Sequence, residues 1–139
     1  MLIQEVMTRN VECVEADALL KDAASRMEIF NVGSLPVCDH DQLVGILTDR
    51  DIAVRSIADG KDPRSTTVRD VMTPEIVYCF DDQGVEEAVQ VMKENQIRRL
   101  PILDQDNRLI GIVSLGDLAN DFGDKEVVGR ALDRISRPD

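Results

Sequence analysis

The sequence has little of what several large classes of protein depend on. No stretch of its 139 residues approaches the roughly 20 apolar residues that a membrane helix requires. The opening segment, MLIQEVMTRN, lacks the basic start and apolar middle of a signal peptide. Lys and Arg number 16 against 27 Asp and Glu, which gives a net charge of −11. Nucleic-acid binding needs clustered cations, so we expect a cytoplasmic protein that binds neither DNA, RNA nor membranes.

Residues that carry catalysis or bind metals are also scarce. His40 is the only histidine, and no Ser or Cys follows a nucleophile-elbow pattern or lies beside an obvious base. The three cysteines, Cys13, Cys38 and Cys79, are far apart in the sequence and form no CxxC pair, which suggests reduced thiols. Cys38 and His40 supply only two donors, whereas a tetrahedral zinc site needs four. The sequence therefore predicts no enzyme, no metal site and no required cofactor.

The chain does contain one pattern written twice. A shift of 65 residues aligns VMT at residues 6–8 with VMT at 71–73, and GSLPV at 33–37 with RRLPI at 98–102. After one extra residue in a polar turn, LVGILTDRD aligns with LIGIVSLGD. An insertion confined to a turn is typical of a structural repeat. A unit of about 60 residues buries too little surface to be stable alone, so we expect the two copies to share a core.

Each copy is predicted to run strand, helix, strand, strand, helix, which makes the fold class α+β. Apolar runs at residues 11–14 and 76–79 predict buried strands, and the segments around each Leu-Pro and each LVGILT or LIGIVS predict a hairpin. Asp17 and Asp82 are placed to cap the helices that follow. These helices have apolar residues at helical spacing: Leu19, Leu20, Ala23, Ala24, Met27 and Phe30 in the first copy, and Val85, Ala88, Val89 and Met92 in the second.

The predicted domain organisation follows the two copies. Residues 1–60 form the first repeat, 61–70 a polar linker, 71–122 the second repeat and 123–139 a C-terminal tail. Apolar residues on one face between residues 125 and 135 predict a helix in this tail, packed on the body or on another subunit.

The segment GILTDRD recurs in the second copy as GIVSLGD; we call these two segments the repeated motif. Gly45 and Gly111 open it, and each glycine allows a ligand or a second backbone to approach closely, or marks a kink in the strand. A second helix is expected to begin within each motif, at Asp49 and at Leu115.

Two interpretations of the repeated motif remain open. Thr48 with Asp51, and Ser114 with Asp117, match a capping box, in which the hydroxyl accepts a first-turn amide and the acid reaches back. The alternative adds a ligand to this geometry. A helix N-terminus attracts phosphate, and a nearby carboxylate can accept both hydroxyls of a ribose.

A chain of this net charge needs local cations to hold a nucleotide. Arg50 lies inside the first motif, and Arg98 and Arg99 begin the paired strand of the second copy, where the first copy has Gly33 and Ser34. The planar guanidinium suits phosphate. The two sites are therefore expected to differ in affinity.

On these residues the chain resembles a tandem pair of CBS domains, the module named after cystathionine beta-synthase and often called a Bateman module. The resemblance rests on VMT, on the strands VGSLPV and IRRLPI, and on the repeated motif, in this order and twice between residues 2 and 121. It implies two β-α-β-β-α repeats packed about a pseudo-twofold axis, with two clefts.

In relatives such as the gamma subunit of the AMP-activated kinase and IMP dehydrogenase, the motif's Asp holds the ribose and its Thr or Ser contacts ribose or phosphate. The resemblance therefore implies two sets of binding residues: Asp117, Ser114 and Arg99 in the second repeat, and Asp51, Thr48 and Arg50 in the first. Four apolar residues would contact the adenine: Val11, Ile46, Ile76 and Ile112. Ser34 and Gly116 depart from the family pattern, because they leave neither cleft with a full set of cations.

The function implied by the resemblance is that of a regulatory module. It would bind AMP, ADP, ATP or S-adenosylmethionine, act as a homodimer, and signal to an effector that is a separate protein. The alternative is a ligand-free scaffold whose helices serve self-association.

Overall fold

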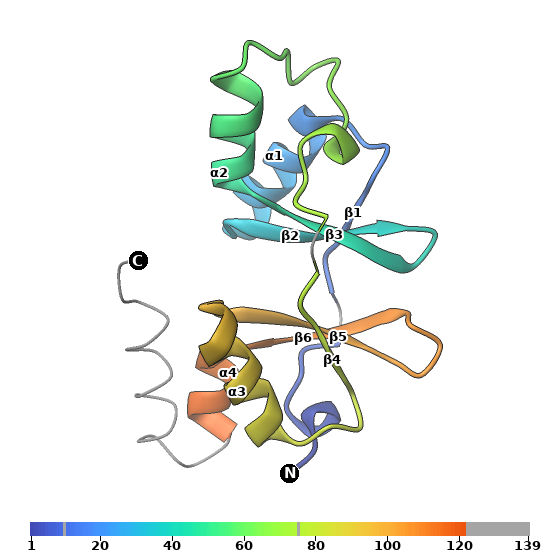
Figure 1. The fold of residues 1–139 in the computed structure, drawn as a ribbon, viewed down its shortest axis with the longest axis vertical. Coiled ribbons are helices and arrows are strands. Elements are labelled where there is room, and N and C mark those ends of the chain that lie inside the picture. The colour runs from blue at the N-terminus through green and yellow to red at the C-terminus, as the bar shows by residue number, and fades with distance from the viewer. Residues whose placement is uncertain (10, 75, 122–139) are drawn as a thin grey trace. The chain divides into compact units, whose positions relative to one another are not determined.

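A computed structural model describes residues 1–9, 11–74 and 76–121 and confirms the α+β class (Figure 1). The elements of the first copy are β1 (Val14–Glu15), α1 (Leu20–Phe30), β2 (Ser34–Asp39), β3 (Gln42–Thr48), α2 (Asp49–Asp51) and the π-helix η2 (Ile52–Ile57). Those of the second copy are β4 (Cys79–Phe80), α3 (Val85–Asn95), β5 (Arg99–Leu103), β6 (Leu109–Ser114) and α4 (Leu115–Asp121). The 3-10 helices η1 (Ile3–Glu5) and η3 (Val68–Asp70) directly precede the two VMT segments.

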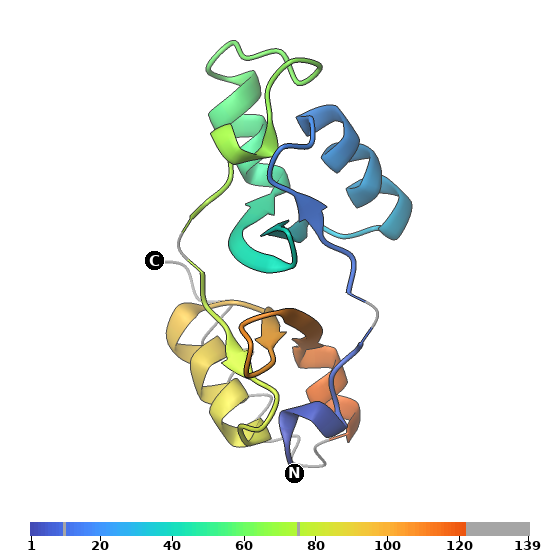
Figure 2. The ribbon, with the colours of Figure 1, turned by 90° about the vertical axis from the view of Figure 1, so that its right-hand side faces the viewer.

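The described residues form two three-stranded sheets, ordered β1-β2-β3 and β4-β5-β6. In each sheet the first pair of strands is parallel. The second pair is an antiparallel hairpin, which confirms the predicted hairpins. The register places Val37 opposite Gly45 and Ile102 opposite Gly111, and each hairpin shifts register directly after this pair. Figures 1 and 2 show that the helices of each copy cover one face of its own sheet. The duplication therefore extends to the irregularities of the fold.

The parallel edge strands are shorter than the predicted runs at residues 11–14 and 76–79. β1 pairs only through Val14 and Glu15, and β4 only through Cys79 and Phe80. Only the last residue of each predicted run lies in the observed strand and is buried, so each run indicated that a strand occurs there but gave the wrong bounds.

The prediction that Asp17 and Asp82 cap the following helices is wrong, because α1 and α3 begin further along the chain and have no side-chain cap. Backbone carbonyls satisfy their first amides instead. In α1 the first two amides donate to Thr66 and Pro63, at 2.9 and 3.0 Å, and in α3 the first amide donates to Met1 at 3.0 Å. These partners are too distant in sequence for a local capping pattern to indicate them.

The predicted apolar faces of the two helices are only partly confirmed. All four predicted residues of α3 are buried. In the first copy Leu20, Ala23 and Met27 are buried, whereas Leu19, Ala24 and Phe30 are exposed. The predicted tail helix lies outside the described residues.

Each compact unit of the structure combines most of one sequence copy with the first residues of the other copy. Among the described residues, the segment 1–11 packs with residues 77–121, and residues 12–76 form the other unit. The backbone of Thr8 pairs with Ile112 of β6 through bonds of 2.8 and 3.0 Å, and Thr73 pairs with Ile46 of β3 through bonds of 2.9 and 3.0 Å. Each VMT segment thus lies against the hairpin of the other copy.

Each unit has its own apolar core, built from both copies. In one, Ile3, Val6 and Met7 join residues of the second copy; in the other, Val68 and Val71 join residues of the first. Within the described ranges, no helix has the length and apolar character needed to cross a membrane.

We predict that Gly45→Ala destabilises the fold by about 1–3 kcal/mol, because overpacking forces a shift of the backbone. A methyl group at this position would lie 2.7 Å from the carbonyl oxygen of Thr73 and 2.8 Å from the sulfur of Met72. Urea denaturation measures the effect. Gly84→Ala is the control, since nothing lies within 4 Å of a methyl group there. Equal midpoints for the two variants would show that the strand does not need this close approach.

Candidate functional site

The repeated motif forms two capping boxes with nearly the same geometry. In the first, the Thr48 amide donates to Asp51 Oδ2 at 3.1 Å, and the Asp51 amide donates to Thr48 Oγ1 at 3.0 Å. In the second, the Ser114 amide donates to Asp117 Oδ2 at 3.2 Å, and the Asp117 amide donates to Ser114 Oγ at 3.0 Å. The predicted capping role is therefore confirmed in both copies.

Capping does not exclude a ligand at these carboxylates. An ionised carboxylate offers about four lone-pair positions, and the capping box occupies one of them. The side chain of Asp51 is 13% exposed, so it is mostly shielded from water but still reachable. The junction of strand and helix thus fixes a carboxylate that retains acceptor capacity.

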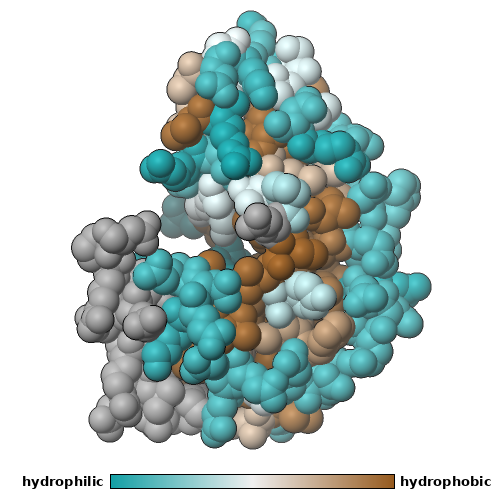
Figure 3. All heavy atoms as spheres, viewed as in Figure 1, coloured by the Kyte–Doolittle hydropathy of each residue, from teal (hydrophilic) through white to brown (hydrophobic). Residues whose placement is uncertain are grey.

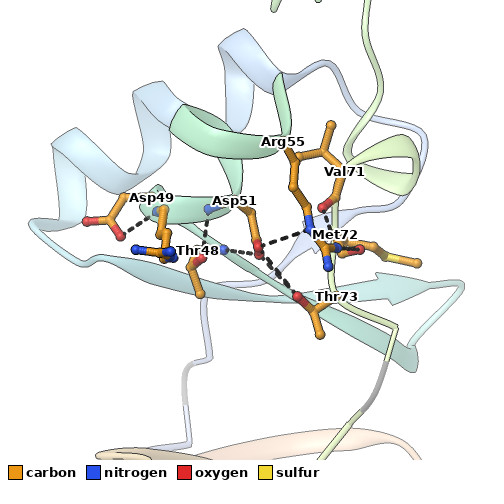
Figure 4. Close-up of polar contacts among 8 residues, drawn as sticks. Thr48, Asp49, Asp51, Arg55, Val71, Met72 and Thr73 are labelled. Atoms are coloured by element: carbon orange, nitrogen blue, oxygen red, sulfur yellow. Dashed lines mark hydrogen bonds and ion pairs between the residues drawn. The ribbon is translucent and has the colours of Figure 1, made fainter. Parts of the chain in front are cut away.

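The first site has further contacts that the sequence did not indicate (Figure 4). The Thr73 hydroxyl lies 3.5 Å from Asp51 Oδ1 and 3.4 Å from Oδ2, and Arg55 Nε lies 3.9 Å from Oδ1. Arg55 also donates through Nη1 to the carbonyls of Val71 and Met72, at 3.4 and 3.3 Å. The spacing of Asp51 and Arg55 along the helix was a usable signal for the ion pair. No local pattern pointed to Thr73.

The predicted cations lie close to the motifs in the fold. Arg99 opens β5 directly opposite Ser114, in the place that Ser34 takes opposite Thr48 in the first hairpin. Arg50 follows Thr48 within α2 and is exposed. The structure therefore brings Arg99, Ser114 and Asp117 to one strand-helix junction of the second copy.

The four apolar residues predicted to contact adenine divide between the two units. Ile46 and Ile76 belong to one and are half-buried. Val11 and Ile112 belong to the other, and Ile112 is only 7% exposed. Their contact with adenine stays a prediction.

Two of the three thiols, which are far apart in sequence, lie together: Cys13 directly precedes β1, and Cys38 lies in the neighbouring strand β2. A hydrogen bond from Cys38 lowers the pKa of the Cys13 thiol to about 7, while the same bond and burial raise the pKa of Cys38. Burial raises the pKa of Cys79 to about 11. In the described part of the chain, no three His, Cys, Asp or Glu side chains are grouped to hold a metal ion.

We predict that Cys13 reacts with iodoacetamide with a rate that rises through about pH 7, because the thiolate is the reactive form. Mass spectrometry of peptides from the native protein follows each thiol separately. Cys79 should stay unreactive over the same range, and Cys38→Ala should move the Cys13 midpoint upward. A Cys13 midpoint near 9 in the unaltered protein would contradict the contact.

Comparison with known proteins agrees with this arrangement. The model of the CBS domain matches residues 3–57 and again residues 68–124. This chain belongs to the CBS domain family. It is 46% identical over 134 residues to the CBS domain-containing protein YhcV of Bacillus subtilis, covering 96% of this chain and 94% of YhcV. It is 36% identical over 126 residues to Hypoxic response protein 1 of Mycobacterium tuberculosis, covering 90% and 87%.

Solved structures show the same fold. The crystal structure of Hypoxic Response Protein I with two coordinated zinc ions matches with a TM-score of 0.80. The match covers 87% of this chain and 98% of the Hypoxic Response Protein I chain. CBSX2 in complex with AMP is 28% identical, with a TM-score of 0.72 and 98% coverage of both chains. The CBS domain pair of MJ0100, in complex with 5′-methylthioadenosine and S-adenosyl-L-methionine, is 27% identical, with a TM-score of 0.74 and coverage of 88% and 100%.

Proposed function

We propose that this protein is a regulatory module that binds adenosine nucleotides at its two capping carboxylates and signals to a separate effector protein. The observation that carries the proposal is the paired capping box. It holds Asp51 and Asp117 at fixed positions, each with acceptor capacity left for the two hydroxyls of a ribose. Carboxylates read ribose in the same way in dinucleotide-binding folds.

The ligands of the relatives support an adenosyl compound. CBSX2 holds AMP, and MJ0100 holds 5′-methylthioadenosine and S-adenosyl-L-methionine. These molecules share adenine and a ribose diol and differ in the group at the 5′ position. A carboxylate recognises the shared ribose diol, and a cation recognises a phosphate at the 5′ position. Because Arg99 lies opposite Ser114, the second repeat is the better candidate for AMP, ADP or ATP.

Signalling requires that the nucleotide prefer one arrangement of the protein over another. The shift that it produces can be no larger than its differential affinity for the two arrangements. We propose no catalytic step. The separate effector protein senses the change of arrangement that the nucleotide produces.

We predict that Asp117→Ala weakens AMP binding by about 1–3 kcal/mol, through loss of a charged hydrogen-bond acceptor. The loss of a cap costs about 1 kcal/mol of folding stability. Isothermal titration calorimetry with AMP, ADP, ATP and S-adenosylmethionine gives the affinities, and urea denaturation gives the stability. Asp82→Ala removes an exposed acid of the same repeat and is the matched control. Intact AMP affinity in the less stable Asp117→Ala protein would restrict this residue to capping.

A scaffold for self-association is the second candidate, and exposed apolar residues in the first repeat favour it. Four large apolar side chains of α1 and η2 are at least 43% exposed: Ile29, Phe30, Val54 and Ile57. The second repeat has Glu94 and Asn95 in place of Ile29 and Phe30. On the face that Figure 3 shows, hydrophobic residues are visible among mostly hydrophilic ones. We propose that the homodimer forms through this region of the first repeat.

Replacing Ile29, which is 75% exposed, by the glutamate of the aligned position should weaken the dimer. Burial of an isoleucine side chain contributes about 1.5–3 kcal/mol, and the glutamate adds a charge. Sedimentation velocity over a range of concentrations measures the dissociation constant. Glu94→Gln, at the aligned position of the second repeat, should leave it unchanged. A dimer equally stable in the Ile29→Glu protein would place the interface elsewhere.

A further inference from the structure

The carboxylate of Asp51 has an orientation problem that its capping box does not solve. The terminal torsion of an aspartate is broad and roughly two-fold, so one contact to Oδ2 leaves the plane of the carboxylate free to turn. The Thr48 amide at 3.1 Å is that one contact. A ribose diol needs both oxygens presented in a defined plane, because its two hydroxyls are held by the sugar ring.

Two side chains supply the missing orientation. The Thr73 hydroxyl is almost equidistant from both oxygens of Asp51, at 3.5 and 3.4 Å, and Arg55 Nε lies on the Oδ1 side at 3.9 Å. The two distances from the Thr73 hydroxyl exceed the usual length of about 2.7–2.8 Å for a hydrogen bond between a hydroxyl and an oxygen. Most of the acceptor strength of the carboxylate therefore remains for a closer ligand. Figure 4 shows these groups converging on the carboxylate.

Thr73 is itself held firmly in place. Its backbone pairs with Ile46 in both directions, at 2.9 and 3.0 Å. Arg55 donates to the carbonyls of Val71 and Met72, the two residues directly before Thr73. Because Arg55 is 52% exposed, its ion pair with Asp51 contributes little stability, and its contacts matter for orientation instead.

The second repeat differs at both aligned positions. Thr8 occupies the position of Thr73 and pairs with Ile112 through its backbone, yet no hydrogen bond joins its hydroxyl to Asp117 among the described residues. The residue aligned with Arg55 is Asp121, which has the opposite charge. The two contacts therefore distinguish two sites whose capping boxes are otherwise alike.

We propose that Thr73 and Arg55 are positioning residues that orient the Asp51 carboxylate to recognise the 2′- and 3′-hydroxyls of a nucleoside, so that the first repeat discriminates ribose from 2′-deoxyribose. This inference rests on the proposed function. It adds two residues that contact the acid rather than the ligand, and one of them, Thr73, comes from the VMT segment of the second copy.

The test is the ratio of the dissociation constants for 2′-deoxy-AMP and AMP, measured by calorimetry in the full chain. Asp117→Asn is present throughout, so that the first repeat is measured alone. Loss of one charge-assisted hydrogen bond predicts a ratio of about tenfold. Thr73→Val keeps the size and backbone pairing of the residue, and we expect the ratio to fall to about threefold or less. Arg55→Met should lower it in the same direction.

Two variants separate positioning from a general effect on the fold. Thr73→Ser restores the hydroxyl and should restore the ratio, and Thr8→Val makes the matched change in the second repeat and should leave it at about tenfold. A full ratio in the Thr73→Val protein, whatever its overall affinity, overturns the inference but leaves the proposed function intact. Failure of the Asp117→Asn protein to bind AMP overturns the inference alone, whereas failure of the unaltered protein to bind AMP, ADP, ATP or S-adenosylmethionine overturns the proposed function as well.

Discussion

One hydrogen-bonded ring, formed at the junction of strand and helix in each copy, underlies both the fold and the proposed binding sites. The backbone amide of the last strand residue, Thr48 or Ser114, donates to the carboxylate of the aspartate three residues later, and the hydroxyl of the same Thr or Ser accepts the amide of that aspartate. The ring ends the strand, starts the helix and fixes an acidic group at the same place. Because a carboxylate has more acceptor positions than the ring uses, a structural cap and a binding group are compatible in one residue.

The exchange of segments explains why the glycines and the VMT sequences occur together. Met7 and Thr8 lie against Gly111, and Met72 and Thr73 lie against Gly45, where any larger residue would meet them. The VMT segment of the second copy therefore packs in the same unit as the first hairpin. Its Thr73 also contacts the capping carboxylate of Asp51. We propose that a ligand on Asp51 acts through Thr73 on the segment that leads to the second repeat.

The sequence predicted what depends on neighbours along the chain. The capping boxes and the hairpins follow from short spacings, and both are confirmed. The caps at Asp17 and Asp82 were predicted by the same local reasoning and are wrong, because carbonyls of Thr66 and Met1 already bind the helix amides. Thr73 was missed for the same reason, since it lies 22 residues from Asp51. Contacts between segments that fold back on each other have no local signature.

A crystal structure of the complex with AMP tests most directly whether the capping carboxylates bind ribose. We predict that at least one ribose has both hydroxyls within hydrogen-bonding distance of Asp51 or Asp117, while the bond from the Thr48 or Ser114 amide to that carboxylate persists. A nucleotide bound away from both carboxylates, with each acid contacting only its own capping amide, would contradict this claim.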